Sequence, residues 1–186
     1  MGREFGIGAR LPRLEDARFL QGRGQFCADI NLPGMLHAAF VRSPHAHARI
    51  VAVRKPQGAD QRVFIAGDLS GVGRMRSTAK LPGFKPSDWP ILAAGKVRHV
   101  GEPVAMVLAP TAGEAEDLAA RVEVEFEPLS PVVTMADALR KQAPFVHDEW
   151  GDNILLDLKM EAGDLAAAKA AAAHVVERRF RMNRMH

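Results

Sequence analysis

The sequence predicts a single mixed α/β domain, and three neighbouring segments carry this prediction. Residues 104–109 are apolar throughout, as in a strand that is covered on both faces. Residues 111–122 repeat apolar side chains at helical spacing, and residues 122–127 alternate apolar and acidic side chains, as in a strand with one solvent-exposed face. A strand, a helix and a strand within about 25 residues are most simply a right-handed crossover between parallel strands, so we expect a mixed sheet.

The chain before this unit is predicted to contain an arm, several short strands and a loop. Residues 1–34 are rich in Gly and Arg and indicate an extended, largely irregular arm, which the turn-forming Leu32-Pro33-Gly34 closes. Apolar or extended runs predict short strands at 35–41, 49–53, 62–65 and 97–100. Residues 67–90, rich in Gly, Pro, Ser and Lys, predict a long surface loop.

A capping box is predicted to begin the central helix. Thr111 lies three residues before Glu114, so its hydroxyl can accept from a free amide of the first turn while the Glu114 side chain reaches back. Beyond Pro128, the pattern predicts a short helix at 135–139, a strand at 153–159, a helix from Asp164 to about Ala173 and an extended run at 174–182. No internal repeat and no linker divides this region, so we expect one domain over residues 35–182.

The composition excludes several classes of protein. The net charge is only +3, aromatic residues make up 6% and Tyr is missing, which is unlike a nucleic-acid-binding surface. Cys27 is the only cysteine, so neither an intrachain disulfide nor a cysteine-based zinc site can form. We also find no signal peptide in residues 1–13 and no apolar window of membrane-spanning length, and therefore expect a cytoplasmic location with no membrane contact.

Glu123, Glu125 and Glu127 are the first candidate for a site. They share one face of a predicted strand, so a metal site is conceivable. Their side chains would lie in a row about 7 Å apart rather than converge on one point. A solvated outer face is the better interpretation.

Three histidines are the second candidate. His45 and His47 lie two residues apart, and His37 is the only further imidazole nearby, so a zinc site needs all three. We prefer polar contacts within a loop. Ser43 and His45 also resemble a nucleophile and its base, but the pair is too common to predict that chemistry.

Glycine pairs are the third candidate. Gly22 with Gly24, and Gly71 with Gly73, resemble the start of a dinucleotide-binding fingerprint, but neither pair follows a predicted strand or opens a predicted helix. The sequence also lacks a phosphate loop and a nucleophile elbow. We therefore assign no catalytic, cofactor-binding or metal-binding residue in this chain.

Two longer stretches are much more specific. The first runs from Arg13 to Phe26 and on from Asp29 to Ile50, and it includes Arg42-Ser43-Pro44-His45-Ala46-His47-Ala48. The second runs from Lys96 to Ala105 and is followed by Ala115-Glu116-Asp117 and residues 122–129. Both resemble the amino-terminal region of molybdenum hydroxylase large subunits, the family of xanthine dehydrogenase, aldehyde oxidase and aerobic carbon monoxide dehydrogenase. The resemblance covers residues 6–182 and is poorest over 62–90.

The resemblance implies an α/β hammerhead fold, which agrees with the predicted order of elements. It also implies that the molybdopterin cofactor and the catalytic glutamate belong to later domains of a longer chain. No motif in residues 1–186 matches a molybdenum ligand or catalytic base of the family. Residues 183–186 would be the junction to that missing half. Residues 64–69 keep only part of the family's Thr-Gly-Asp-Leu stretch.

The expected function follows from the resemblance. We expect a non-catalytic domain or split subunit that supports the molybdopterin-binding domains of an oxidoreductase. The implied partners are the carboxy-terminal molybdopterin-binding half, an iron–sulfur subunit and a flavin subunit, and a homo-oligomer is also possible. Two alternatives stay open: a stand-alone scaffold or binding protein derived from this domain, and a free enzyme that uses His45, His47 and Glu102.

Overall fold

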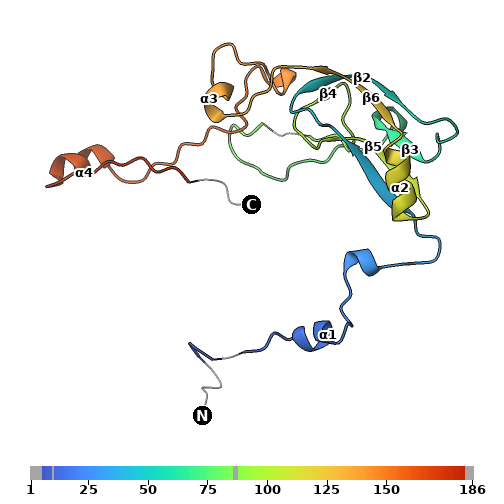
Figure 1. Ribbon diagram of the computed structural model, residues 1–186. Helices are drawn as coiled ribbons and strands as arrows, with labels where there is room; N and C mark the ends of the chain where they lie inside the picture. Colours follow the sequence, from blue (N-terminus) through green and yellow to red (C-terminus); the bar gives the residue numbers. More distant parts are fainter. Residues whose placement is uncertain (1–5, 10, 86–87, 183–186) are drawn as a thin grey trace. The chain divides into compact units, whose positions relative to one another are not determined.

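The computed structural model describes residues 6–9, 11–85 and 88–182, and the chain forms two compact units (Figure 1). Unit 1 comprises Met1–Val72 with Leu92–Leu129, and unit 2 comprises Gly73–Ile91 with Ser130–His186. The chain therefore leaves unit 1 after Val72, returns to it at Leu92 and leaves it again after Leu129. All the named strands belong to unit 1.

Unit 1 is built on two three-stranded sheets. The first has the order β1 (His37–Arg42), β5 (Pro103–Ala109) and β3 (Val63–Ile65). The second has the order β4 (Lys96–Val97), β2 (Ala48–Arg54) and β6 (Glu123–Pro128). Helix α2 (Ala112–Ala119) packs against β1 and β5 of the first sheet.

The α/β hammerhead prediction is confirmed, but one expected detail of its topology is wrong. The strands on either side of α2, β5 and β6, lie in different sheets, and every strand pairing among the described residues is antiparallel. The helix therefore connects two sheets instead of crossing over between parallel neighbours in a mixed sheet. Periodicity shows which faces of an element are covered, but it carries no information on its hydrogen-bonding partner.

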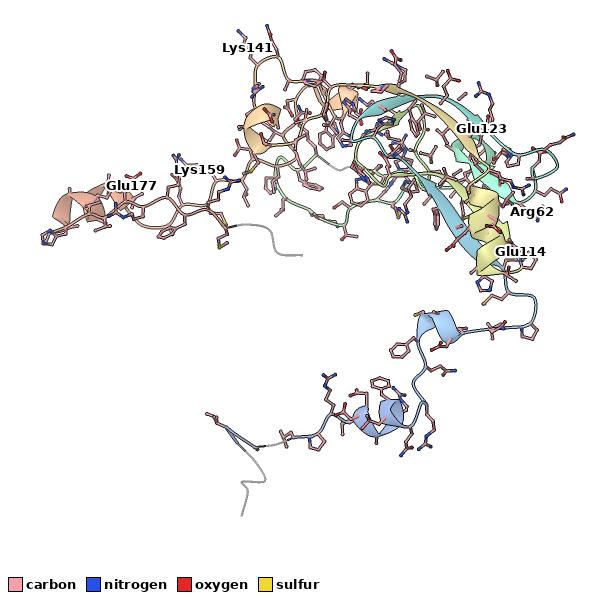
Figure 2. The ribbon with its side chains drawn as sticks, in the orientation of Figure 1. Arg62, Glu114, Glu123, Lys141, Lys159 and Glu177 are labelled. Carbon is pink, nitrogen blue, oxygen red and sulfur yellow. The ribbon has the colours of Figure 1, made fainter. Side chains whose placement is uncertain are left out.

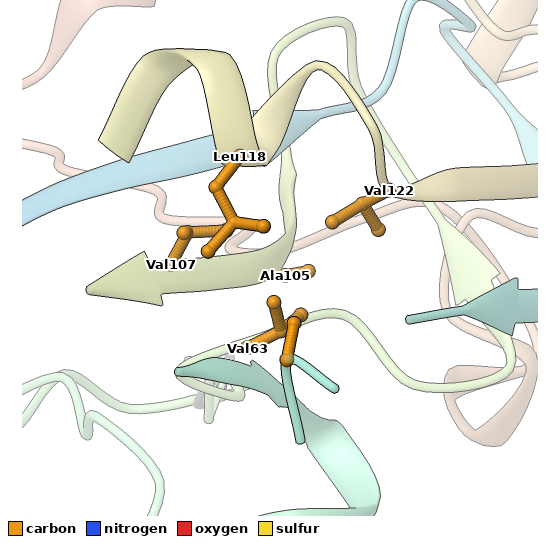
Figure 3. Packing of buried hydrophobic residues seen from close by; sticks show 6 residues of the cluster. Val63, Ala105, Val107, Leu118 and Val122 are labelled. Atoms are coloured by element: carbon orange, nitrogen blue, oxygen red, sulfur yellow. The ribbon is translucent and has the colours of Figure 1, made fainter. Parts of the chain in front are cut away.

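The core of unit 1 lies between α2 and the first sheet. Leu118 projects from the helix toward Val107 and Ala105 of β5, with Val122 and Val63 close by (Figure 3). All five are buried, and Val63, Ala105 and Val107 have no exposed surface at all. A second cluster packs against the other sheet and consists of Ala48, Ala93, Val97 and Val104.

Helix α2 begins with the Thr111 half of the predicted capping box. The Thr111 hydroxyl accepts a hydrogen bond from the Glu114 amide at 3.2 Å, which satisfies one free amide of the first turn. Ala115 and Leu118 face the core, whereas Ala112 is exposed although it lies on the same predicted stripe.

The faces of two strands test the sequence patterns directly. Strand β6 has its three glutamates exposed while Val124 and Phe126 are half-buried, as the alternation predicts. Strand β1 alternates in the same way; the nearly continuous apolar run at 35–41 predicts a strand covered on both faces, and that expectation is wrong. Its exposed face carries the apolar residues Ala38 and Phe40, so an apolar composition alone does not show that both faces are buried. The predicted strand at 97–100 is also shorter, since β4 ends at Val97.

Unit 2 contains two of the predicted helices and lacks one predicted strand. Helices α3 (Met135–Ala138) and α4 (Leu165–Ala171) begin after Thr134 and Asp164, whose side chains accept from Asp137 and Ala167 amides. Residues 153–159 form no strand: the Leu155 carbonyl accepts from the Lys85 amide at 2.9 Å, and the Ile154 amide donates to the Asp152 side chain instead of a neighbouring strand.

The segment 67–90 is predicted as a loop, and its described residues, 67–85 and 88–90, have regular structure only at the start and at one bridge. A 3₁₀ turn spans Ala66–Asp68, and Met75 pairs with Trp89 in an isolated bridge. The Lys85 ammonium forms an ion pair of 2.6 Å with Asp152 and lies 5.9 Å from the centre of the Trp150 ring, which belongs to a second 3₁₀ turn (Asp148–Trp150). These contacts join the two chain segments of unit 2.

The arm has more local structure than the sequence predicts. It contains α1 (Asp16–Leu20) and a 3₁₀ turn (Cys27–Asp29). The Phe19 and Phe26 rings stack with centroids 5.7 Å apart. A Cβ atom at Gly24 would lie 2.9 Å from the Phe19 ring, so only glycine allows this stack without a shift.

Candidate functional site

The two most recognisable sequence blocks meet in unit 1, where the loop after β1 lies against the turn before β5. The Ser43 amide donates to the Glu102 carbonyl at 2.9 Å, and the Gly101 amide donates to the Ser43 carbonyl at 2.8 Å. The Arg42 guanidinium also donates to the Gly101 carbonyl at 2.9 Å. These hydrogen bonds continue the pairing of β1 with β5 beyond the register shift at Val41/Arg42. They hold the two segments of the candidate site together.

Ser43 is buried, and its hydroxyl closes the loop that follows. The hydroxyl donates to the His45 carbonyl at 2.9 Å and accepts from the His45 amide at 3.0 Å. Both contacts go to the backbone of His45. The His45 ring instead meets the edge of the Phe126 ring, with centroids 5.1 Å apart. Ser43 and His45 therefore do not form a nucleophile–base pair, which requires a hydrogen bond between the hydroxyl and the imidazole.

Glu102 is a buried carboxylate with a local structural partner. Only 8% of its surface is exposed, and its side chain accepts a short hydrogen bond from the Arg98 amide. Gly101 has φ +83°, a conformation that favours glycine, so the residue before Glu102 shapes the same turn. A buried carboxylate costs free energy unless it is hydrogen-bonded, and this turn supplies the bond.

His47 is buried just before β2, and its carbonyl accepts from the Leu129 amide at 2.9 Å. His37 belongs to β1, and His45 to the loop between these strands. Within the described part of the chain, no group of three His, Cys, Asp or Glu side chains is arranged to hold a metal ion. The histidines thus do not supply the converging ligand set that a zinc site needs.

The glutamates of β6 have cationic neighbours on β2. Glu127 pairs with Arg49 at 3.1 Å and Glu125 with Arg54 at 2.9 Å, and all four side chains are at least half exposed. Glu123 projects from the start of the strand (Figure 2). Exposed ion pairs of this kind contribute about 0–1 kcal/mol each. The geometry is a cross-strand charge ladder and not a metal site.

The glycine pairs lie in turns. Gly22 follows α1 with φ +67°, and Gly71 has φ +88°. The segment after Gly24 forms only the short 3₁₀ turn that contains the exposed Cys27, so no helix N-terminus is present there to bind a pyrophosphate.

Sequence reasoning missed one well-defined charged pair in unit 1. The Lys55 ammonium lies 2.7 Å from the Asp68 carboxylate, which also accepts from the Ile65 amide at 2.8 Å. The hydrogen bond from Lys55, followed by that from Ile65, lowers the pKa of Asp68 below its usual value. The partners lie 13 positions apart in the sequence, and no local periodicity connects them. The pair fastens the end of β3 to the segment after β2.

Comparison with known proteins identifies the family of this chain. Residues 21–130 match the model described as "Aldehyde oxidase and xanthine dehydrogenase, a/b hammerhead domain". The chain belongs to this family of molybdenum hydroxylases. It is 35% identical to the nicotine 6-hydroxylase large subunit of Paenarthrobacter nicotinovorans over 96% of its own length and 22% of that protein. It is also 35% identical to the carbon monoxide dehydrogenase large chain of Afipia carboxidovorans, over 80% of its own length and 18% of that protein.

The solved structure of quinoline 2-oxidoreductase from Pseudomonas putida 86 matches the hammerhead chain in three dimensions. The match has a TM-score of 0.78 and 36% identity, and it covers 91% of this chain and 22% of that one. The chain thus spans about a fifth of the length of these relatives. Because the structural match extends well beyond residues 21–130, it includes parts of the chain outside the family model.

The depression between β1 and α2 carries charges of both signs, Glu116 on the helix and Arg42 on the strand, beside His37, Phe40 and four alanines, so it has no net charge that would select a phosphate-bearing cofactor. Elsewhere, the Ser43 hydroxyl and the Glu102 carboxylate already bond to the backbone. No helix in the described ranges is long and apolar enough to span a membrane.

Proposed function

We propose that this hammerhead chain is a non-catalytic part of a molybdenum-dependent oxidoreductase. It supports the molybdopterin-binding domains of the large subunit and works in the cytoplasm beside an iron–sulfur subunit and a flavin subunit. Its family membership and its coverage of only 22% of the nicotine 6-hydroxylase large subunit support this role. The reducing cytoplasm also suits a chain whose single cysteine is exposed.

The observation that carries the proposal is the apolar surface left open on the arm and on the segment after α4. Ile7, Leu14 and Leu20 expose 98%, 97% and 87% of their surface. Phe180 and Met182 expose 85% and 92%. Single exposed apolar residues are ordinary, but series of them along two segments are typical of an interface. Burial stabilises by about 25 cal/mol per Å² of apolar area, so covering both segments would favour binding of a partner.

The polar residues of unit 1 support a structural role. The Ser43 hydroxyl and the Glu102 carboxylate both bond to backbone groups of their own turns. A catalytic pair needs two side chains within hydrogen-bonding reach of each other and of a reacting atom. The side chains of Ser43 and Glu102 instead shape their own turns, and backbone hydrogen bonds hold the loop after β1 against the turn before β5.

Size-exclusion chromatography of the chain mixed with a separately produced molybdopterin-binding part of the same enzyme tests the proposal. We expect the two polypeptides to elute together as one complex. Without the partner, the same open apolar surface should cause self-association that grows with concentration. A double variant, Leu14→Glu with Phe180→Glu, should weaken the complex because it charges both segments.

Val133→Glu is the matched control, since Val133 is 77% exposed but lies outside both segments. This variant should bind the partner as the original chain does. A strictly monomeric chain that never co-elutes with the molybdopterin-binding part would contradict the proposal and favour the alternative, a stand-alone scaffold derived from the hammerhead domain.

A further inference from the structure

The four sheet edges of unit 1 differ in their protection against additional strands. An edge strand exposes unpaired amides and carbonyls, and proteins commonly shorten it or place charges on it. Strand β3 has three residues and β4 has two, so both offer little backbone. Strand β6 has six residues but carries three glutamates. Strand β1 also has six residues, but His37 and Arg42 stand at its two ends, so its middle has no such protection.

The middle of β1 is suited to receiving another strand. Its residues Ala38, Ala39, Phe40 and Val41 include neither a charge nor a proline. Within the described residues β1 pairs only with β5, so its other edge is open. Alternate residues of an antiparallel edge direct their amides and carbonyls outward, where an extended peptide can bind them.

Helix α2 adds a side wall to this open edge. A depression of about 370 Å³ lies between them, and α2 lines it with Ala112, Glu116 and Ala119. Along a helix these positions are about 6 Å and about 4.5 Å apart. Side chains on one face of a strand repeat about every 6.6 Å. Three successive same-face side chains of an added strand would therefore lie close to the three helix positions.

The charge of α2 indicates which strand would fit. Its residues Glu114, Glu116 and Asp117 are acidic, and Glu116 is the one that lines the depression. Strand β1 lines the same depression with His37 at its first position and Arg42 at its last, and the Arg42 guanidinium donates to the Gly101 carbonyl. Glu114 projects near the start of the helix (Figure 2). A basic side chain opposite Glu116 would be attracted, whereas an acidic one would be repelled. On either side, Ala112 and Ala119 leave room for apolar side chains of moderate size.

We propose that the open edge of β1, with Ala112, Glu116 and Ala119 of α2 beside it, binds an extended strand of another polypeptide that carries an Arg or Lys between two apolar residues on the same face. The strand would add to the first sheet by main-chain hydrogen bonds, and the pair with Glu116 would select its sequence. This inference deepens the proposed function. It rests on that function only for its assumption that the strand belongs to another part of the oxidoreductase.

Nuclear magnetic resonance with a designed peptide tests the edge without the natural partner. The probe is acetyl-Thr-Val-Thr-Arg-Thr-Val-Thr-amide, titrated to millimolar concentration into the isotope-labelled chain. We expect chemical shift changes centred on residues 37–42 and 112–119, with slower hydrogen exchange at alternate β1 amides. A peptide with Glu in place of Arg should bind about fivefold more weakly, as loss of one exposed ion pair predicts.

A charge swap provides the decisive control. Glu116→Lys should reverse the preference, so that the Glu-containing peptide binds about fivefold better than the Arg-containing one. Asp117→Lys changes the same charge on the same helix outside the depression, and it should leave the preference as it is. Shifts that map elsewhere, or a preference that Glu116→Lys does not change, would overturn the inference. The peptides require no molybdopterin-binding part, so either result stands apart from the test of the proposed function.

Discussion

Leu118→Ala is the substitution that tests the core of unit 1 most sharply. Leu118 exposes 2% of its surface and packs against Val107, Ala105 and Val63. The change removes about three carbon groups at about 0.8 kcal/mol each, or about 2.4 kcal/mol. A residual cavity of about 40 Å³ adds about 1 kcal/mol, at about 24 cal/mol per Å³. Helix α2 has only eight residues and can relax inward, so we expect a loss of about 3 kcal/mol.

Urea unfolding followed by far-ultraviolet circular dichroism measures this loss. Tryptophan fluorescence is less suitable, because Trp89 and Trp150 both belong to unit 2. Glu125→Ala is the control: it removes one exposed ion pair with Arg54 and should change the free energy of unfolding by no more than about 0.5 kcal/mol. If Leu118→Ala proves less destabilising than Glu125→Ala, the assignment of buried and exposed faces is wrong.

Three further predictions follow from other parts of the molecule. Thr111→Ala should lower the free energy of unfolding by about 1 kcal/mol, while Thr111→Ser restores most of it; urea unfolding of both variants checks the cap of α2. Lys85 lowers the pKa of Asp152, so Lys85→Met should raise that pKa toward its usual value in an NMR titration; an unchanged titration would contradict the pair. This lowered pKa stabilises the folded state above the usual Asp pKa, and the stabilisation disappears as the pH falls through the lowered value. The chain purified alone should contain no stoichiometric molybdenum, iron or flavin, because one cysteine cannot ligate an iron–sulfur cluster; about one metal ion per chain by elemental analysis would refute this.

Local patterns predicted the elements whose structure is determined locally. The apolar run of β5, the Thr111 cap and the alternation of β6 each report burial or hydrogen bonding within a few residues, and all three agree with the structure. The prediction of a strand at 153–159 was wrong, because an extended run forms a strand only when it pairs with a neighbouring strand. The predicted crossover between parallel strands was also wrong, because β5 and β6 pair with strands of different sheets and the local sequence does not encode these partners.

The candidate site depended on contacts between distant parts of the sequence. The exchange of hydrogen bonds between Ser43 and the 101–102 turn joins residues nearly 60 positions apart, which no periodicity detects. The family resemblance marked both blocks as distinctive without indicating that they touch. The Lys55–Asp68 pair was invisible for the same physical reason: side-chain geometry is set by the tertiary fold.

The molybdenum content of the cofactor-binding part tests the central claim most directly. This part of the enzyme should be produced with and without the hammerhead chain, purified under identical conditions, and its molybdenum measured per polypeptide by mass spectrometry. If the chain supports the cofactor-binding domains, the co-produced sample should retain clearly more molybdenum, and the Leu14→Glu, Phe180→Glu variant should lose that advantage. Equal molybdenum content in both samples, with the chain present in the purified complex, would contradict a supporting role.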